Sequence, residues 1–280
     1  MEVAAQLAPK LLDHLRFVLA DSKYILHAAN DWVGLEAEIR SHPIDVAVVD
    51  PCRGGGIHLR TIKVLLSRFP SLPIVLYTTL TPETLRVTVE LLKYGIPQVV
   101  LHGFDDEPAR LRGLLERQPA RVIEERLLGK MSARLIRLPP PLAQAIGEMF
   151  RAPHQFRSVE DLTAHAGITR RSVDRYLAEV GLASAHTLLT AARVVRVYHY
   201  SRDPGYLMDD VRKKVAYGSA RLLVRQVRAA TGLTPSALRR TVKPEQFITE
   251  MAAHLHRAAR SRTHDNVSRR QRRPRPHRGR

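Results

Sequence analysis

Charged side chains recur at helical spacing between residues 170 and 175, where they could bind phosphate groups or read the edges of base pairs. Arg170, Arg171, Asp174 and Arg175 would lie about one turn apart on one face of a helix. A guanidinium group can hold a phosphate or a guanine edge with two hydrogen bonds. We therefore take this face as a candidate nucleic-acid contact, against the alternative of a merely solvated helix surface.

A second set of the same kind follows further along the chain. Arg221, Arg225 and Arg228 also have helical spacing, and Ser219 is placed to cap the helix that carries them. Two matched sets in one chain favour contact with DNA over two chance clusters.

Four other candidates could do chemistry, and each gives a weak signal. Asp50 follows an apolar run and could accept a phosphoryl group or cap the end of a strand. Cys52, the one cysteine, is a poor reactive thiol because the neighbouring carboxylate disfavours its thiolate. The glycine run 54–56 lacks the lysine and hydroxyl residue of a nucleotide-binding loop. His254 and His256 would lie on different sides of a helix. We therefore expect no enzyme activity, no metal site and no cofactor.

The formal net charge of +18 at pH 7 favours a polyanionic partner, because lysine and arginine displace the counter-ions condensed on DNA. Acidic residues are frequent up to Glu125, whereas residues 257–280 hold many arginines and one acidic residue, Asp265. We expect a basic, disordered tail over 257–280 that adds phosphate contacts, although such a run can also serve only solubility.

A chain of 280 residues is long enough for two domains with separate cores. It contains no apolar stretch that could cross a membrane and no secretion signal, so we expect a cytoplasmic location and no membrane partner. The single cysteine fits a reducing compartment.

Residues 1–117 alternate short apolar runs with amphipathic segments, which predicts a parallel sheet covered by helices. A weak strand is expected first, followed by a helix. The predicted strands are 3–7, 25–29, 45–49, 74–77 and 99–101, and the helices between them include 10–19, 59–69 and 84–94.

Beyond Gly103 only helical patterns occur, and three prolines at 139–141 interrupt them. We expect helices over 108–117 and 121–128, a linker over 118–141, and an all-helical domain over 142–242. The predicted helices of that domain are 142–151, 159–165, 170–179, 185–201, 207–213, 219–230 and 235–239.

Caps and turns give this domain a repeated plan. Ser158 and Thr169 are placed to cap two short helices around a turn at Gly167. A second pair of helices surrounds a turn at residues 216–218. This is the arrangement of two helix-turn-helix units, in which the second helix of each unit can enter a major groove.

Residues 142–240 resemble the AraC-type DNA-binding domain, in which a long helix joins two helix-turn-helix units. The matching text is AGITRRSVDRYLAEVG and then VAYGSARLLVRQVRAATGLTPSALRR. The resemblance implies that both recognition helices enter successive major grooves. It assigns DNA contacts by position to Arg170, Arg171, Asp174 and Arg175 and to Ala220, Arg221, Val224 and Arg225. Ala216 departs from the glycine that usually occupies the second turn.

Residues 1–117 resemble the receiver domain of bacterial response regulators. Asp50 stands where that family has its phosphate-accepting aspartate, Thr78 where it has a hydroxyl residue, and His102 where it has lysine. The magnesium-binding acids expected at the end of the first strand are replaced by the sequence Gln-Leu-Ala at 6–8. Phosphoryl transfer to a carboxylate needs that metal, so Asp50 is expected to be a vestigial phosphoacceptor.

The expected fold class is therefore an α/β receiver-like parallel-sheet domain followed by an all-α domain with two helix-turn-helix units. The expected function is sequence-specific, phosphorylation-independent regulation of transcription. Its partners would be double-stranded DNA and a second copy of the chain, paired through the amino-terminal domain. The alternatives are an architectural protein that binds DNA without sequence preference and a phosphorylated response regulator.

Overall fold

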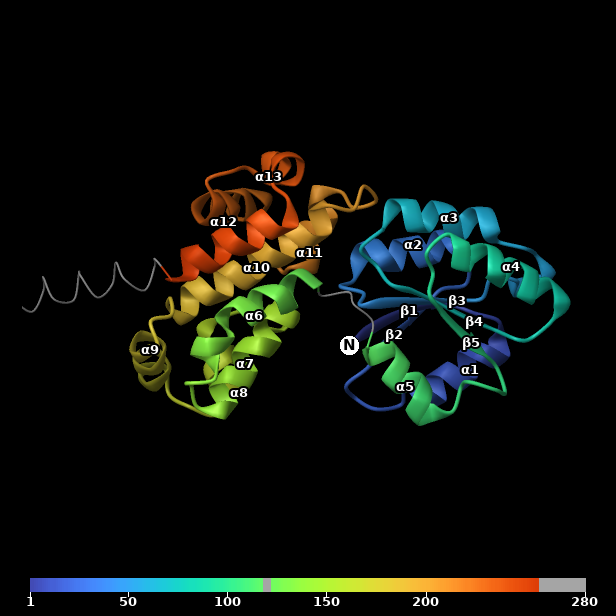
Figure 1. Cartoon of the computed structure of the whole chain (residues 1–280), viewed down its shortest axis with the longest axis horizontal. Coiled ribbons are helices and arrows are strands. Elements are labelled where there is room, and N and C mark those ends of the chain that lie inside the picture. Colours follow the sequence, from blue (N-terminus) through green and yellow to red (C-terminus); the bar gives the residue numbers. More distant parts are fainter. Residues whose placement is uncertain (118–121, 257–280) are drawn as a thin grey trace, which may run out of the picture. The chain divides into compact units, whose positions relative to one another are not determined.

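The computed structural model describes residues 1–117 and 122–256, which form two compact units. The first unit comprises residues 1–117 together with 199–220, and the second comprises residues 122–198 together with 221–256. The division falls inside the helical half of the chain, and each unit is described by itself. Figure 1 labels the helices and strands of both.

The first unit is built on a five-stranded sheet in which all strand pairs are parallel, with the order β2-β1-β3-β4-β5. This is the order of flavodoxin-like doubly wound folds, where ligand sites lie at the carboxyl ends of the strands beside the reversal of strand order. The strands are β1 (Glu2–Gln6), β2 (Ile25–Ala28), β3 (Val46–Val49), β4 (Ile74–Thr78) and β5 (Gln98–Leu101).

Two layers of helices enclose this sheet. α1 (Pro9–Val18) and α5 (Pro108–Glu116) cover one face (Figure 1). α2 (Trp32–Ser41), α3 (Leu59–Arg68) and α4 (Pro82–Lys93) cover the other.

The core of this unit explains its apolar strands. Side chains alternate between the two faces of a strand, and Val3, Val48 and Tyr77 pack with Leu11 of α1 and Leu111 of α5. The intervening positions of β1, β3 and β4 are buried as well. Burial on both faces is the reason that these strands appear in the sequence as continuous apolar runs.

The five predicted strands are all present, and none of their bounds differs by more than one residue from the prediction. The strand predicted least securely, β1, has a low β-propensity because it is rich in alanine. Its position between β2 and β3 gives it hydrogen-bonded neighbours on both sides. Tertiary packing therefore outweighs its weak local preference.

The second unit contains helices and no strand among its described residues. α6 packs against α7, α7 against α8, and α8 against α9. The helices from α6 onward are α6 (Val122–Leu135), α7 (Pro140–Arg151), α8 (Val159–Ala166), α9 (Arg170–Glu179), α10 (Ala185–Ser201), α11 (Met208–Lys214), α12 (Ala220–Thr231) and α13 (Pro235–Thr241). α11 belongs to the first unit, and the division between the units falls within α10. The expected fold class is thus confirmed: an α/β parallel-sheet domain is followed by a helical region.

α6 differs from the linker expected over 118–141. It is longer than the predicted 121–128, and Leu127, Leu128 and Met131 on it are buried. The buried Glu124 carboxylate lies 3.3 Å from Arg196 Nε of α10. Residues 122–135 therefore belong to the packed core of the second unit.

A helical segment over 244–256 was not predicted from the sequence. Phe247, Met251 and Leu255 on this segment are buried. The ring of Phe247 stacks on Tyr198 of α10 at a centroid distance of 4.0 Å. The core of the second unit therefore extends past residue 242, where the predicted domain ends.

No helix in the described part of the chain combines the length and apolar character that a bilayer span requires.

α11 packs within the α/β unit, against α2. Lys214 is only 2% exposed, and its ammonium group donates to two carbonyls at the end of α2, one of them that of His42. The same ammonium lies 4.9 Å from the ring centre of Tyr200 and 4.8 Å from that of Tyr206. A helix that the sequence assigns to the second helix-turn-helix is thus part of the first unit by packing.

The turn after α11 holds Ala216 in the left-handed region, at φ 55°. The Ala216 N–H donates to Lys213 O and the Tyr217 N–H donates to Arg212 O, both at 3.0 Å, which is a Schellman motif. The same pair of bonds follows α8, where Gly167 takes the left-handed position at φ 64°. The two turns share one backbone design, but alanine carries a Cβ that this conformation disfavours.

Ala216→Gly should therefore raise the free energy of unfolding by about 1 kcal/mol, because glycine adopts a positive φ without a steric penalty. The matched control is Ala229→Gly, at an exposed position inside α12, which should lower it by about 1 kcal/mol. Urea unfolding followed by circular dichroism measures both. A loss of stability in Ala216→Gly would contradict the left-handed turn.

Candidate nucleic-acid interface

Local hydrogen bonds set the start of both helices in the first pair. The Asp161 N–H donates to Ser158 Oγ at 3.4 Å and the Ser158 N–H donates to the Asp161 carboxylate at 2.9 Å, a capping box that begins α8. The Ser172 N–H donates to Thr169 Oγ1 at 3.3 Å, which begins α9. The predicted caps at Ser158 and Thr169 and the predicted turn at Gly167 are confirmed.

Two buried side chains, Val173 and Leu177, fix the orientation of α9. They lie one turn apart, so the opposite side of the helix faces solvent. The four predicted contact residues on α9 are exposed or half-buried: Arg170, Arg171, Asp174 and Arg175.

Of the three arginines on α9, Arg171 is the one whose charge is not offset by an ion pair with a described residue. Arg170 Nη1 lies 2.8 Å from Glu160 Oε1 of α8, and Arg175 Nε lies 3.7 Å from Glu179 Oε1. Arg171 forms no hydrogen bond or ion pair with any described residue. It also occupies the first turn of α9, where the helix dipole disfavours a cation. An anion bound at this end of the helix would offset both effects.

α12 repeats the design of α9. Leu223 and Val227 are buried one turn apart, and Arg221, Arg225 and Arg228 are exposed. These three arginines, which we call the α12 stripe, have the spacing of one helix face. None of them forms an ion pair within the described part of the chain.

The other predicted DNA contacts near α12 are uncharged residues, so their exposure says less about DNA binding. Ser219 and Ala220 are exposed at the start of α12, and Val224 is half-buried. α11 and α12 fall in different units, so the structure describes each of these helices separately.

Several other arginines in the described part of the chain have acidic partners. Arg68, Arg110, Arg151 and Arg212 each form an ion pair with a glutamate or an aspartate. Arg171 and the α12 stripe differ from them in that no described acid offsets their charge. The basic tail expected over 257–280 lies outside the described residues, so the candidate interface consists of α9 and α12.

Asp50 lies at the carboxyl end of β3 and is 5% exposed. Its Oδ1 accepts the Thr78 hydroxyl at 2.9 Å and the Cys52 N–H at 3.0 Å, so the carboxylate caps the end of its strand. At the end of the neighbouring β1, the receiver family has acidic residues that bind magnesium. Here the uncharged Gln6 and Leu7 occupy these positions and are buried. The Gln6 Oε1 atom has no hydrogen-bond partner among the described residues. The end of β1 therefore supplies no carboxylate for a magnesium ion.

Cys52 and the loop that contains Gly54 and Gly55 directly follow Asp50 in the chain. Burial raises the pKa of the Cys52 thiol, and the Asp50 and Glu83 carboxylates raise it further, which agrees with the predicted inert cysteine. Gly54 and Gly55 adopt a positive φ within a short 3-10 turn, as expected of a plain loop.

His102, which stands where the receiver family has lysine, makes its contacts with Asp106. His102 Nδ1 lies 2.6 Å from Asp106 Oδ2, the Tyr77 hydroxyl donates to the same oxygen at 2.6 Å, and the Gly103 N–H donates to Oδ1 at 2.9 Å. His14 Nε2 lies 2.9 Å from the Asp106 carbonyl oxygen. Sequence reasoning missed this group because its members come from α1, β4 and the segment after β5.

These contacts shift the protonation of two buried groups. Burial alone would raise the pKa of Asp106, but the hydrogen bonds from Tyr77, His102 and Gly103 outweigh it and lower that pKa to about 2. Burial and the hydrogen bond to Asp106 raise the pKa of Tyr77 well above its ordinary value. The carboxylate is therefore held in its charged form by the fold.

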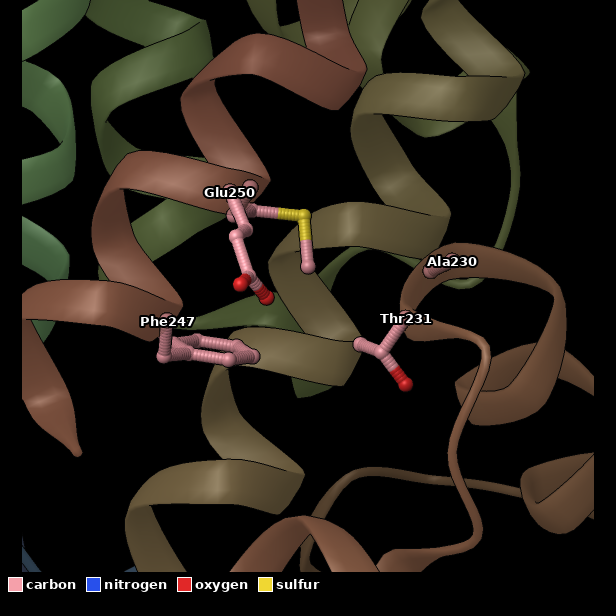
Figure 2. Close-up of a pocket in the computed structure, with 5 residues that line it drawn as sticks. Ala230, Thr231, Phe247 and Glu250 are labelled. Atoms are coloured by element: carbon pink, nitrogen blue, oxygen red, sulfur yellow. The ribbon is translucent and has the colours of Figure 1, made fainter. Parts of the chain in front are cut away.

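An open pocket of about 460 Å³ lies between the end of α12 and the helical segment 244–256 (Figure 2). Its lining residues are Ala230, Thr231, Phe247, Glu250 and Met251. The one charged group among them, the Glu250 carboxylate, would repel phosphate. The pocket is therefore not part of the candidate interface.

Comparisons with known proteins leave the family open. No protein-family model matches the chain, and no curated protein matches it. Solved structures that resemble it include full-length FixJ from B. japonicum, with 17% identity over 83% of this chain and 98% of FixJ and a TM-score of 0.39. RcsB from Salmonella enterica serovar Typhimurium, bound to promoter rprA, gives 18% identity over 68% of this chain and 97% of RcsB and a TM-score of 0.34. The scores are too low for either structure to assign a function to this chain.

The pKa of Asp106 leads to a prediction for stability in acid. A carboxyl group whose pKa falls from 3.8 to about 2 on folding stabilises the folded state above pH 3.8 and loses that effect as the pH falls toward 2. The full effect is about 2 kcal/mol. Asp106→Asn should therefore flatten the fall in unfolding free energy across this window, as measured by urea unfolding at a series of pH values. Tyr77→Phe keeps the carboxylate but removes one donor, so it should flatten the fall only in part. A slope in Asp106→Asn equal to that of the wild type would contradict this role.

Proposed function

We propose that this chain is a sequence-specific DNA-binding regulator of transcription of the AraC type, in which α9 and α12 are the helices that enter the major groove. The observation that carries the proposal is that Arg171 and the α12 stripe are exposed and lack an acidic partner among the described residues. The like charges of the α12 stripe lie on one helix face and repel one another, and a polyanion offsets that repulsion. The formal net charge of the whole chain is +18, which also favours binding to a polyanion.

The backbone of the two turns supports a repeated unit. Gly167 after α8 and Ala216 after α11 occupy the same left-handed position with the same hydrogen bonds. Each turn is followed by a helix with two buried aliphatic residues one turn apart and arginines on its outward side. Under the proposal, residues 1–117 form the amino-terminal domain, a connecting segment over 118–141 follows, and the DNA-binding domain spans 142–242. The tail 257–280 adds phosphate contacts, and the protein acts in the cytoplasm.

The two helices would contribute differently to recognition. α9 offers Arg170, Arg171, Asp174 and Arg175, which can make directional hydrogen bonds to base edges. On α12, Ala220 and Val224 can offer only apolar contact, so its arginines would mainly hold phosphates. We therefore place most of the base readout on α9.

Regulation is proposed to be independent of phosphorylation. Asp50 and Thr78 retain the geometry of an acceptor site, and this favours the phosphorylated response regulator as the second candidate. The buried Gln6 and Leu7 at the end of β1 argue against it, because the magnesium ion would lack its acidic ligands there.

Selection from a random duplex library tests the proposal. The full chain, at moderate salt, should enrich a defined sequence motif, whereas an architectural protein would enrich none. On the enriched site, Arg171→Ala should weaken binding by about 1–3 kcal/mol, as expected for one arginine contact. Arg86→Ala removes an exposed arginine from α4 and is the matched control, with little change expected.

The same assay separates the alternatives. Asp50→Asn should bind the enriched motif with wild-type affinity if phosphorylation plays no part, whereas a loss or gain would favour the phosphorylated regulator. Binding without enrichment of any sequence motif would favour the architectural protein. Wild-type affinity in both Arg171→Ala and Arg225→Ala would overturn the assignment of α9 and α12.

The α/β unit is proposed to pair with a second copy of the chain. Leu85, Val89 and Leu92 on α4 are 56%, 43% and 44% exposed, and their spacing forms one apolar stripe. Such a stripe can pack against its own copy across a two-fold axis, because an isologous interface needs only one self-complementary surface.

Leu85→Glu should therefore shift the chain toward the monomer in sedimentation equilibrium, by placing two like charges in the pairing surface. Ile136→Glu is the matched control, because Ile136 is 85% exposed and lies in the second unit. A wild-type chain that stays monomeric over the whole concentration range would refute this pairing.

A further inference from the structure

Three side chains distant in sequence converge beside the first two strands of the α/β unit. Glu2 begins β1, His27 lies in β2 and His42 follows α2. One ligand atom from each lies within 4.8 Å of those of the other two. His27 Nε2 is 3.0 Å from Glu2 Oε2, and the rings of His27 and His42 are 4.1 Å apart between centroids.

A fourth side chain, Glu38 of α2, orients both imidazoles. Its Oε2 lies 3.3 Å from His27 Nδ1 and 3.3 Å from His42 Nε2. Histidines that bind metal ions typically donate their other ring N–H to a carboxylate, which fixes the tautomer and the direction of the ring. The contact between His27 Nδ1 and Glu38 has that form, and it leaves Nε2 directed at Glu2.

Hydrogen bonding to neutral histidine does not account for this arrangement. An uncharged imidazole has one N–H, whereas His27 has a carboxylate at each of its two nitrogens. Either the ring carries a second proton or a cation takes the place of that proton. Glu2 and His27 have side chains only 11% and 13% exposed, so solvent contributes little to balancing the charge of the carboxylate.

We propose that Glu2, His27 and His42 bind a divalent transition-metal ion of the zinc class, with Glu38 as the positioning residue. Imidazole nitrogen together with carboxylate oxygen is a ligand set that Zn²⁺ accepts. Bond lengths of about 2.0–2.2 Å in a tetrahedral site put ligand atoms roughly 3.4 Å apart. His27 Nε2 and Glu2 Oε2 are 3.0 Å apart, and all three ligand atoms lie within 4.8 Å of one another. His42 is 45% exposed and gives the ion access from solvent. The inference does not depend on the proposed DNA binding.

The two glutamates also match a dication in charge. They bring two negative charges to a partly buried site, and a divalent ion neutralises both. The ion would join β1, β2 and the end of α2, three segments that are otherwise linked there by hydrogen bonds and ring contacts. Binding to the folded chain should therefore also stabilise the first unit against unfolding.

Calorimetric titration of the full chain with Zn²⁺ tests the site, after treatment with a chelator and without a polyhistidine tag. The chain has 13 histidines, so weak binding elsewhere must be separated from a stoichiometric site. One ion per chain should bind tightly, and Co²⁺ at the same site should give a visible absorption spectrum of nitrogen and oxygen ligation. Glu38→Gln should weaken binding about 10- to 100-fold, the usual effect of losing a residue that orients a ligand.

The decisive variant is His42→Ala, because His42 is exposed enough for the chain to tolerate the change. It should abolish stoichiometric binding, and thermal unfolding without metal should confirm that it folds. His27→Gln should do the same, while the double variant His254→Ala with His256→Ala is the matched control and should bind as the wild type does. The proposal is overturned if the wild type takes up no stoichiometric ion, or if His42→Ala retains the tight site.

Discussion

Two pairs of buried aliphatic side chains determine which residues the chain presents on α9 and α12. Val173 and Leu177 lie four residues apart on α9, as do Leu223 and Val227 on α12, and all four are fully buried. Burying both members of a pair allows the helix only one rotation about its axis. Removing such a side chain typically costs about 2–5 kcal/mol, far more than a surface ion pair contributes. The outward position of the arginines is thus imposed by the core, and contacts of their own are not needed to hold them there.

Periodicity and capping explain how much of the fold could be predicted from the sequence. The strands of the α/β unit were predictable because burial on both faces makes each of them a continuous apolar run. α8 and α9 were predictable because Ser158, Gly167 and Thr169 act locally. The segment 244–256 carries the same kind of signal, with Pro244 at its start and the buried Phe247, Met251 and Leu255 four residues apart. It lies beyond residue 240, however, where the AraC resemblance ends, and no helix was assigned to it. α6 was underestimated for a different reason, because its packing against α7 is a tertiary effect.

The site residues also fall into those that the sequence could predict and those that it could not. The outward arginines follow from helical spacing, and the bond between Thr78 and Asp50 agrees with the positions that the receiver resemblance gives to these residues. The Asp106 group and the group formed by Glu2, His27 and His42 follow from neither. β1 and β2 pair with Ala4 opposite His27, and that register, together with the end of α2, brings residues 2, 27 and 42 together. The spacing of residues within one segment cannot predict contacts between three segments. Metal-ligand spacing in the sequence therefore pointed only to His254 and His256.

The buried Lys214 has a consequence for how the chain can be divided. Its ammonium is hydrogen-bonded to α2 and lies over the rings of Tyr200 and Tyr206, so the first unit is assembled from two stretches of sequence that are far apart. A fragment that ends at residue 117 would lack the stretch that completes it. A fragment that begins at residue 122 would expose a lysine and two tyrosines that the intact protein keeps from water. Residues 1–117 are therefore not an autonomous folding unit, because the distant stretch 199–220 completes their interior.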